Sequence, residues 1–157
     1  MGVDDKTFKL ALSHFASGVT VVTTELEGRP FGLTVASFAS LSLNPPLVLV
    51  CVERNVKSHD AIASAGRFGV SILEENQAEI SGRFASRSDD KFTGLDVVRG
   101  KFGLPLIAGA ICAIECELRE KIPGGDHTIF VGEVMTVKTS EGKPLVYYRG
   151  GYRELNA

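Results

Sequence analysis

The sequence predicts a mainly β protein with short helices, folded as a small antiparallel barrel that is closed or partly closed. Three observations support this prediction. Runs of β-branched or alternating residues are numerous, helical spacing is confined to three short segments, and the two kinds of segment do not alternate regularly. A parallel βαβ sheet requires regular alternation, so the strands are expected to be antiparallel. Long alternating strands late in the chain favour a barrel, which also removes exposed strand edges.

Helices are expected where apolar residues recur three and four positions apart. The first has an aspartate that can cap its start, Asp4 or Asp5, and Gly18 beyond its end. Gly66 similarly ends the second helix. The three predicted helices cover residues 8–16, 56–65 and 74–85.

Seven strands are expected from β-branched runs or from alternation of polar and apolar residues. The turn Glu27-Gly28-Arg29-Pro30 joins the first two strands as a hairpin, and the third strand is apolar on both faces, as a buried strand is. Residues 86–108 form a long polar connection, and connections of this length tend to carry function or to cover something. The predicted strands cover residues 19–24, 31–38, 47–52, 68–73, 110–122, 127–138 and 145–149.

The composition is that of an ordinary globular chain. Its 157 residues are 44% hydrophobic and 23% charged, which excludes disordered, collagen-like and coiled-coil proteins. A net charge of −2 lacks the basic surplus of a nucleic-acid-binding protein. No apolar run approaches the ~20 residues that cross a bilayer, and the first residues do not resemble a signal peptide. We therefore expect a single domain over residues 1–157, located in the cytoplasm, with neither nucleic acid nor membrane as a partner.

The three cysteines, Cys51, Cys112 and Cys116, are an odd number and cannot form a complete disulfide framework. Cys112 and Cys116 fall in one predicted strand, where four residues span ~13 Å. A disulfide needs Cα atoms within ~7 Å, so these two cannot pair. We expect all three to be buried, reduced thiols.

The usual catalytic and phosphate-binding motifs are absent. The chain has no G-x-G-x-x-G after a strand, no P-loop, no G-x-S-x-G, no H-E-x-x-H and no C-x-x-C. Its three histidines, His14, His59 and His127, are far apart in the sequence. The sequence therefore predicts neither a metal site nor a side-chain nucleophile.

Residues 32–42 combine small side chains with four hydroxyl groups. Hydroxyl and backbone N–H groups can bind the carbonyls and ring nitrogens of a heterocycle when no bulky side chain intervenes. An edge strand whose hydroxyl groups bond to its own backbone is the alternative. On this segment alone, both interpretations stay open.

Residues 53–59 place Arg54, Lys57 and Ser58 where a strand gives way to a helix. Backbone donors and the positive end of a helix attract phosphate at such a point. A solvated turn with a serine cap is the alternative. Three further segments could contribute a ligand wall, a histidine at a strand entrance and a basic aromatic tail over a planar ligand. The alternatives are that Phe84 is a core residue and that His127 caps its turn. These segments are residues 81–86, 123–127 and 147–153.

In this order, the segments resemble the short-chain flavin reductases of two-component monooxygenases, which form the flavin reductase-like, FMN-binding split-barrel family. The resemblance runs from about Thr7 to Tyr152. The matching motifs are residues 15–24 (Phe-Ala-Ser-Gly-Val-Thr-Val-Val-Thr-Thr), residues 34–46 with Ser37-Phe38 and Leu41-Ser42-Leu43-Asn44-Pro45-Pro46, Gly125-Asp126-His127, and Tyr148-Arg149-Gly150-Gly151-Tyr152.

The resemblance implies an antiparallel split barrel that acts as a homodimer, with flavin near the subunit interface. It implies that NADH or NADPH reduces FAD or FMN, and that the reduced flavin passes to a flavin-dependent monooxygenase. Two alternatives remain at this point. One is a split-barrel oxidase or electron carrier that holds FMN, and the other is a non-catalytic barrel that binds a nucleotide.

Site residues are carried over from the same resemblance. The strand at 34–38 would lie along the flavin ring, the turn at 53–59 would receive the ribityl and phosphate groups, and His127 would position the nicotinamide without transferring a proton. The flavin contacts implied are Leu33, Thr34, Val35, Ala36, Ser37, Phe38, Ser40, Glu53, Arg54, Ser58, His59, Phe84 and Ala85. Those on the nicotinamide side are His127, Arg149, Gly150 and Tyr152. Among these, we expect Ser37 at the ring and Arg54 with Ser58 at the phosphate. No catalytic side chain is expected, because flavin itself supplies the redox chemistry.

Overall fold

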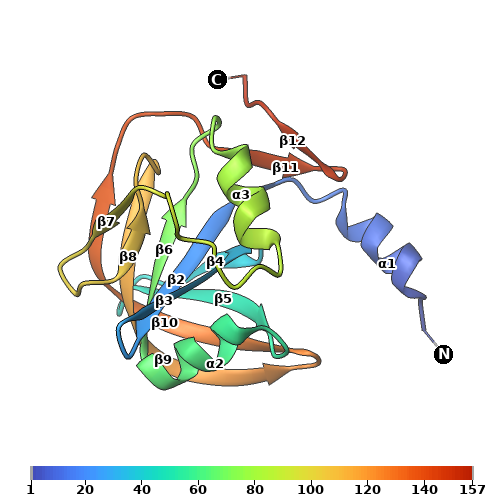
Figure 1. The fold of residues 1–157 in the computed structure, drawn as a ribbon. Helices are drawn as coiled ribbons and strands as arrows, with labels where there is room; N and C mark the ends of the chain where they lie inside the picture. The colour runs from blue at the N-terminus through green and yellow to red at the C-terminus, as the bar shows by residue number, and fades with distance from the viewer. Residues whose placement is uncertain (1, 157) are drawn as a thin grey trace.

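The computed structural model describes residues 2–156. Seven antiparallel strands form its main sheet: β2 (Thr20–Leu26), β3 (Arg29–Val35), β4 (Phe38–Ser42), β5 (Leu47–Glu53), β6 (Arg67–Ile72), β9 (Cys112–Gly124) and β10 (His127–Thr139). Their order is β3-β2-β6-β9-β10-β5-β4, and the sheet curves round a core (Figure 1). The two edge strands, β3 and β4, are joined by only two residues and do not pair with each other. This is the predicted antiparallel barrel, split between β3 and the β4–β5 pair.

Three helices and two small sheets lie around this barrel. The helices are α1 (Asp5–Leu12), α2 (Lys57–Ala65) and α3 (Ala78–Ala85). One small sheet contains β1 (Ser17–Gly18), β11 (Val146–Tyr148) and β12 (Gly151–Arg153), and the other contains β7 (Val97–Arg99) and β8 (Pro105–Ile107). In Figure 1, α2 covers the lower end of the barrel and α3 lies beside the β11–β12 hairpin. No helix within residues 2–156 has the length and hydropathy needed to span a membrane.

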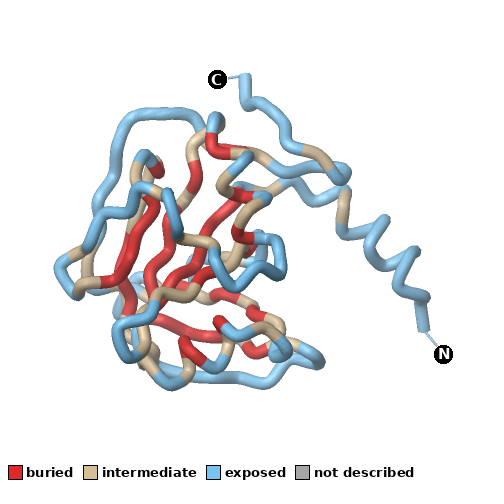
Figure 2. Tube along the Cα trace, in the orientation of Figure 1, coloured by how far each residue is buried: buried red, intermediate tan, exposed pale blue. Residues whose placement is uncertain are grey.

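The core consists of two groups of buried apolar side chains. Figure 2 shows that the buried residues lie mainly along the strands. The larger group fills the barrel and includes Val22, Phe68 and Phe130, all fully buried. The smaller includes Leu73 and Phe84 and packs α3 against the sheet. Because burial of apolar surface is the main favourable term in folding, the larger group holds the barrel and the smaller one fixes the position of α3.

The second predicted strand, 31–38, is interrupted. β3 ends at Val35, the chain bends at Ala36 and Ser37, and Phe38 begins β4. The two parts have different partners, because β3 pairs with β2 whereas β4 pairs with β5. One strand was predicted because the run follows a turn and can pair back on residues 19–24 as a hairpin, and this pairing holds only as far as Val35.

The first helix is shorter than predicted, ending at Leu12 instead of Ala16. Asp4 caps its start by accepting a hydrogen bond from the N–H of Thr7 at 2.7 Å, as expected. At the other end, Ser13 Oγ and His14 Nδ1 both contact the Leu10 carbonyl oxygen, at 2.6 and 2.9 Å. These side-chain hydrogen bonds occupy the Leu10 carbonyl, which in a longer helix would accept from a backbone N–H group. The third helix begins at residue 78, later than the predicted 74.

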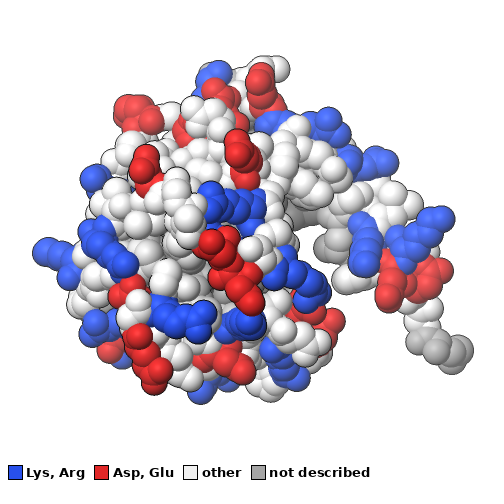
Figure 3. Space-filling view, viewed as in Figure 1, with Lys and Arg blue, Asp and Glu red and all other residues white. Residues whose placement is uncertain are grey.

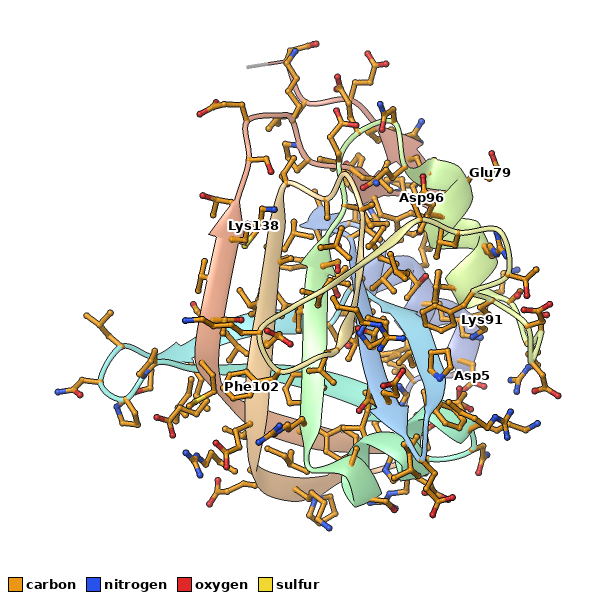
Figure 4. The ribbon with its side chains drawn as sticks, turned by 60° about the vertical axis from the view of Figure 1, so that its left-hand side comes forward. Asp5, Glu79, Lys91, Asp96, Phe102 and Lys138 are labelled. Atoms are coloured by element: carbon orange, nitrogen blue, oxygen red, sulfur yellow. The ribbon has the colours of Figure 1, made fainter. Side chains whose placement is uncertain are left out.

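Strands β7 and β8 form a hairpin inside the connection at 86–108, where no strand was predicted. Buried polar side chains of the main sheet hold it in place. Thr23 Oγ1 donates to the Pro105 carbonyl at 2.5 Å, and Ser71 Oγ accepts from the Ile107 N–H at 3.0 Å. Glu115, 1% exposed, accepts from the Phe102 and Leu104 N–H groups at 3.1 to 3.2 Å. Figure 4 labels Phe102 on the loop that joins the two strands.

The α1 helix projects from the body of the molecule and buries none of its side chains (Figures 1 and 2). Phe8 and Phe15 are 55% and 77% exposed. Figure 3 shows a hollow between this arm and the barrel. The helical spacing predicted correctly that a helix forms, but its apolar side does not join the core of its own chain.

All three cysteines are free, as predicted, although Cys51 and Cys112 are only partly buried. Cys116 is buried, and burial raises the pKa of its thiol to about 12. Burial also raises the pKa of Cys112.

Candidate functional site

A cleft of about 690 Å³ opens at the split in the barrel. One wall is β3 with the bend at residues 36–37, and the opposite side is the end of β5 with His127 at the start of β10. The start of α2 and the end of α3, with residues 86–89, 91 and 92, complete the rim. The cleft therefore gathers segments that are separated by almost a hundred residues of sequence.

Ten of the seventeen residues predicted for the site line this cleft. They are Leu33, Thr34, Val35, Ala36, Ser37, Glu53, Ser58, Phe84, Ala85 and His127. The other seven are not part of its lining: Phe38, Ser40, Arg54, His59, Arg149, Gly150 and Tyr152. The structure thus brings residues 33–37 together with the end of α3 in one cleft, and it places the C-terminal tail outside the cleft lining.

The β3 wall is fixed from behind by α3. Thr34 Oγ1 donates to the carbonyl oxygen of Ser81 at 2.6 Å, and the Phe84 ring packs directly against Gly32. A Cβ atom on Gly32 would lie 2.7 Å from the Phe84 ring, closer than real contacts allow. Glycine at this position therefore sets how closely Phe84 approaches the strand.

The polar atoms along this wall belong to the backbone. Because β3 is an edge strand, one row of its N–H and C=O groups has no partner strand. The Gly32 carbonyl belongs to this row and accepts from Ser58 Oγ at 3.2 Å and from Lys91 Nζ at 3.1 Å. Because successive residues of a strand face opposite ways, the next backbone groups on this side of β3 belong to Thr34. They can form hydrogen bonds with the heteroatoms of a ligand.

The bend between β3 and β4 closes the inner end of the cleft. Ser37 Oγ donates to the Cys51 carbonyl, and the Cys51 N–H donates to the Ser37 carbonyl, both at 3.1 Å. The bend therefore has a fixed position against β5. It also borders a second, mostly apolar cavity of about 770 Å³ beneath the α1 arm, so Ala36, Ser37 and Cys51 line both spaces.

The outer end of the cleft is suited to an anion. The first turn of α2 faces it, and Val56 at the N-cap position has no side-chain capping bond. The His59 N–H donates to the Val56 carbonyl at 3.1 Å, which leaves the N–H groups of Lys57 and Ser58 available within residues 2–156. Lys57, Arg29 and Lys91 also line this end. The positive end of a helix together with cationic side chains attracts phosphate.

Lys91 holds the rim together. Its ammonium group donates to the carbonyl oxygens of Gly32 and Phe84, at 3.1 and 3.0 Å, and so connects β3 to the end of α3. Figure 4 shows Lys91 below α3 and beside β3. Partial burial lowers the pKa of this lysine. Two carbonyl acceptors occupy two of its three N–H donors, which leaves one for a ligand.

His127 forms a pair with its neighbour on the β9–β10 turn. Its Nδ1 lies 2.7 Å from Asp126 Oδ1, and the hydrogen bond and charge of the imidazole lower the pKa of Asp126. Within residues 2–156, Nε2 has no hydrogen-bond partner. The aspartate thus fixes the ring at one nitrogen and leaves the other for a ligand.

Three of the seven predicted residues outside the cleft, His59, Arg149 and Tyr152, have side-chain partners elsewhere. His59 Nε2 lies 2.7 Å from Thr128 Oγ1, and its ring packs on Phe130. Arg149 Nη1 lies 3.0 Å from His14 Nε2, and Tyr152 Oη lies 2.7 Å from Ser81 Oγ. These last two contacts attach the C-terminal hairpin to the start of the chain and to α3.

Sequence reasoning missed several cleft residues. Arg29 was assigned to a turn, and the long connection was recognised as functional only as a whole, without identifying residues inside it. The cleft-lining residues missed in this way include Arg29, Asp89, Lys91 and Phe92. For Asp89, Lys91 and Phe92, the unusual length of the connection at 86–108 was the only signal in the sequence.

Comparison with known proteins agrees with this geometry. Residues 12–156 match the family described as "Flavin reductase like domain". The chain is 40% identical over 153 residues to the reductase subunit HsaB of a flavin-dependent monooxygenase from Mycobacterium tuberculosis, with 96% of this chain and 82% of the relative covered.

Two solved structures superpose closely. Nitrilotriacetate monooxygenase component B from Mycobacterium thermoresistibile gives a TM-score of 0.94 at 42% identity, covering 98% of this chain and 87% of that one. The NADH:FAD oxidoreductase SgcE6 of Streptomyces globisporus, solved with NAD and FAD fragments, gives 0.93 at 38% identity, covering 99% and 97%. With fold, cleft and sequence in agreement, the chain belongs to the flavin reductase family.

Proposed function

We propose that this protein is an NAD(P)H-dependent flavin reductase that supplies reduced flavin to a partner monooxygenase. The observation that carries the proposal is the cleft at the barrel split, where an edge strand with free backbone groups leads to a cationic helix start. The relatives named above support the same reaction. A planar ring system carrying a phosphate is the ligand that such a cleft fits.

The dimensions and donors of the cleft suit a flavin. Its volume of about 690 Å³ falls within the ~300–1,000 Å³ of typical cofactor sites. The backbone groups of β3 and the bend, with Ser37, would hold the polar edge of the ring. The first turn of α2, with Lys57 and the third donor of Lys91, would hold the phosphate.

Bound flavin accepts a hydride from reduced nicotinamide, so the protein has to supply orientation and electrostatics and needs no nucleophile. The packed Phe84 wall excludes water from one side of the ring site. Backbone N–H groups along the bend are placed to stabilise negative charge at the polar edge of the ring. His127, held by Asp126 at Nδ1, positions the nicotinamide with Nε2 and transfers no proton.

Either FMN or FAD is an acceptable substrate in this proposal. Beyond the start of α2 the cleft continues to Arg29, whose guanidinium lies 5.4 Å from the centre of the Phe31 ring. A flat cation over an aromatic ring provides a surface on which the adenine of FAD can stack. NADH and NADPH remain equal candidates as electron donor.

A homodimer is the assembly we propose. The second cavity is lined by Phe8 and Leu12 of α1 and by Phe15 just after it, and residues 2–156 leave more than half of each of these side chains exposed. Exposed apolar surface of this kind marks an interaction site. Because this cavity shares the bend with the cleft, a second copy seated there would lie next to the flavin. Sedimentation of the wild type against Phe15→Asp tests this: the wild type should be dimeric and the variant monomeric.

We also propose a cytoplasmic location. Three free thiols, at Cys51, Cys112 and Cys116, fit a reducing compartment, where disulfides are rare.

One assay tests the reaction. The loss of absorbance at 340 nm is followed with each of NADH and NADPH crossed against each of FMN and FAD, with and without added flavin. The proposal expects turnover that depends on added or retained flavin. Retained flavin without nicotinamide turnover would favour the oxidase or carrier, and a protein that neither retains nor binds flavin would favour the non-catalytic barrel.

A further inference from the structure

At the mouth of the cleft, Lys57 is paired with the carboxylate of Asp89, and two further cations, Arg29 and Lys91, share the cleft lining with this pair. Lys57 Nζ lies 2.7 Å from Asp89 Oδ1. The hydrogen bond and charge of Lys57, followed by the charges of Arg29 and Lys91, hold the pKa of Asp89 below its usual value. All four side chains line the cleft.

These cations come from three separate parts of the fold. Arg29 begins β3, Lys57 begins α2, and Lys91 follows α3. Their presence in one cleft is therefore a product of the tertiary structure and has no counterpart in the sequence pattern. Glu53 is the other acidic residue of the lining and lies at the end of β5. Elsewhere on the face shown in Figure 3, acidic and basic side chains are interleaved.

We propose that Asp89 is an internal anion that competes with the phosphate of flavin for Lys57 and thereby limits the affinity for phosphorylated flavins. The inference rests on the proposed function, because it concerns the phosphate end of the same cleft. Its consequence is specific: Asp89 sets how readily flavin leaves the protein after reduction.

Replacing the Asp89 carboxylate by a flavin phosphate at Lys57 should cost little free energy. The Lys57 and Asp89 side chains are 70% and 68% exposed, and an ion pair between exposed groups contributes little to stability. A phosphate monoester carries about −1.5 to −2 charges near neutral pH, so it can displace a single carboxylate from the lysine. The carboxylate stays close by on the segment that follows α3, where it repels the phosphate and assists its departure.

Asp89 has no competing structural role within residues 2–156. Its side chain makes one hydrogen bond there, to Lys57. The neighbouring Asp90 is different, since it accepts from the Thr93 N–H at 3.2 Å and does not line the cleft. Asp90→Asn therefore removes the same charge one residue away and serves as the matched control for Asp89→Asn.

The experiment titrates the full-length wild type, Asp89→Asn and Asp90→Asn with FMN and with riboflavin, following the quenching of flavin fluorescence. Asp89→Asn should bind FMN about two- to fivefold more tightly, the range expected for one exposed ion pair. The gain should appear as slower FMN release, since affinity changes at one site act mostly on dissociation. Riboflavin, which has no phosphate, should bind all three proteins alike.

A second substitution tests the route of the effect. In a Lys57→Gln background, Asp89→Asn should change FMN affinity less than in the wild type, because the contested cation is gone. Unchanged or weaker FMN binding by Asp89→Asn would overturn the inference, as would an equal change for riboflavin. A wild type that binds FMN but shows no Asp89 effect refutes only this inference, whereas a wild type that binds no flavin refutes the proposed function.

Discussion

Ser37 and Cys51 exchange two hydrogen bonds beside the split of the barrel, each 3.1 Å long, and so extend the pairing of β4 with β5. The pair fastens the bend between β3 and β4 to β5, the strand next to the β4 edge of the sheet, whereas β3 itself pairs only with β2. Both residues line the cleft and the apolar cavity beneath α1. A chemical modification of this pair should therefore alter both the cleft and the apolar cavity beneath α1.

Alkylation should distinguish the three thiols. With iodoacetamide near pH 8, Cys51 should be labelled first and Cys116 should stay unmodified, because a pKa raised to about 12 leaves almost no thiolate. The raised pKa of Cys112 should slow its labelling as well. Peptide mass spectrometry over time provides the measurement.

Saturating FMN provides the control for this labelling. Because Cys51 lines the cleft, bound flavin should slow its modification while the rate at Cys112 stays the same. Labelling of Cys116 ahead of Cys51, or no protection by flavin, would contradict the arrangement.

His127→Ala should raise the KM for the reduced nicotinamide about fivefold, the effect of losing one hydrogen bond worth about 1 kcal/mol. The dissociation constant of flavin should change little, since the imidazole is assigned to the nicotinamide side. Steady-state kinetics and a flavin titration measure the two quantities on the same preparation. Unchanged nicotinamide kinetics would remove His127 from the site.

Glu115→Ala should destabilise the protein by about 3 kcal/mol, because the N–H groups of Phe102 and Leu104 and the hydroxyl of Thr136 would lose a buried acceptor. Urea unfolding measures the change in free energy. Glu117→Ala, on the same strand but partly exposed, should cost no more than about 0.5 kcal/mol. Equal effects of the two substitutions would show that the buried carboxylate does not hold the β7–β8 hairpin.

Gly32→Ala should cost about 1–3 kcal/mol and weaken flavin binding, because the added methyl would displace the Phe84 ring that lines the cleft. Gly18→Ala provides the control, since nothing lies within 4 Å of a Cβ atom there. Urea unfolding and flavin titration should separate the variants. Wild-type flavin affinity in Gly32→Ala would mean that Phe84 is not part of the flavin wall.

Local patterns predicted much of the fold. The β2–β3 hairpin follows from its β-branched run and turn residues, and Gly66 ends α2 in the left-handed conformation that glycine favours. The β7–β8 hairpin could not be predicted in this way. It depends on Thr23, Ser71 and Glu115, which are distant in sequence and become acceptors and donors only after the sheet has formed.

Site residues that follow one another along a strand were predicted well. Site residues on a helix were predicted less well, because neighbouring side chains on a helix point in different directions. Ser58 and His59 are neighbours in sequence, yet successive residues on a helix point about 100° apart. Ser58 therefore faces Gly32, whereas His59 turns toward Thr128. Lys91 could not be found from its own segment, because its acceptors lie on β3 and at the end of α3.

The projecting α1 helix has a thermodynamic consequence. Eight residues with no buried side chain cannot hold helical order alone, because isolated helices of this length are marginal in water. Whatever covers Phe8 and Phe15 therefore contributes the free energy that folds the arm. If the cover is another molecule of the same protein, mass action requires the thermal midpoint to rise with protein concentration, and dilution should unwind the arm before the sheet.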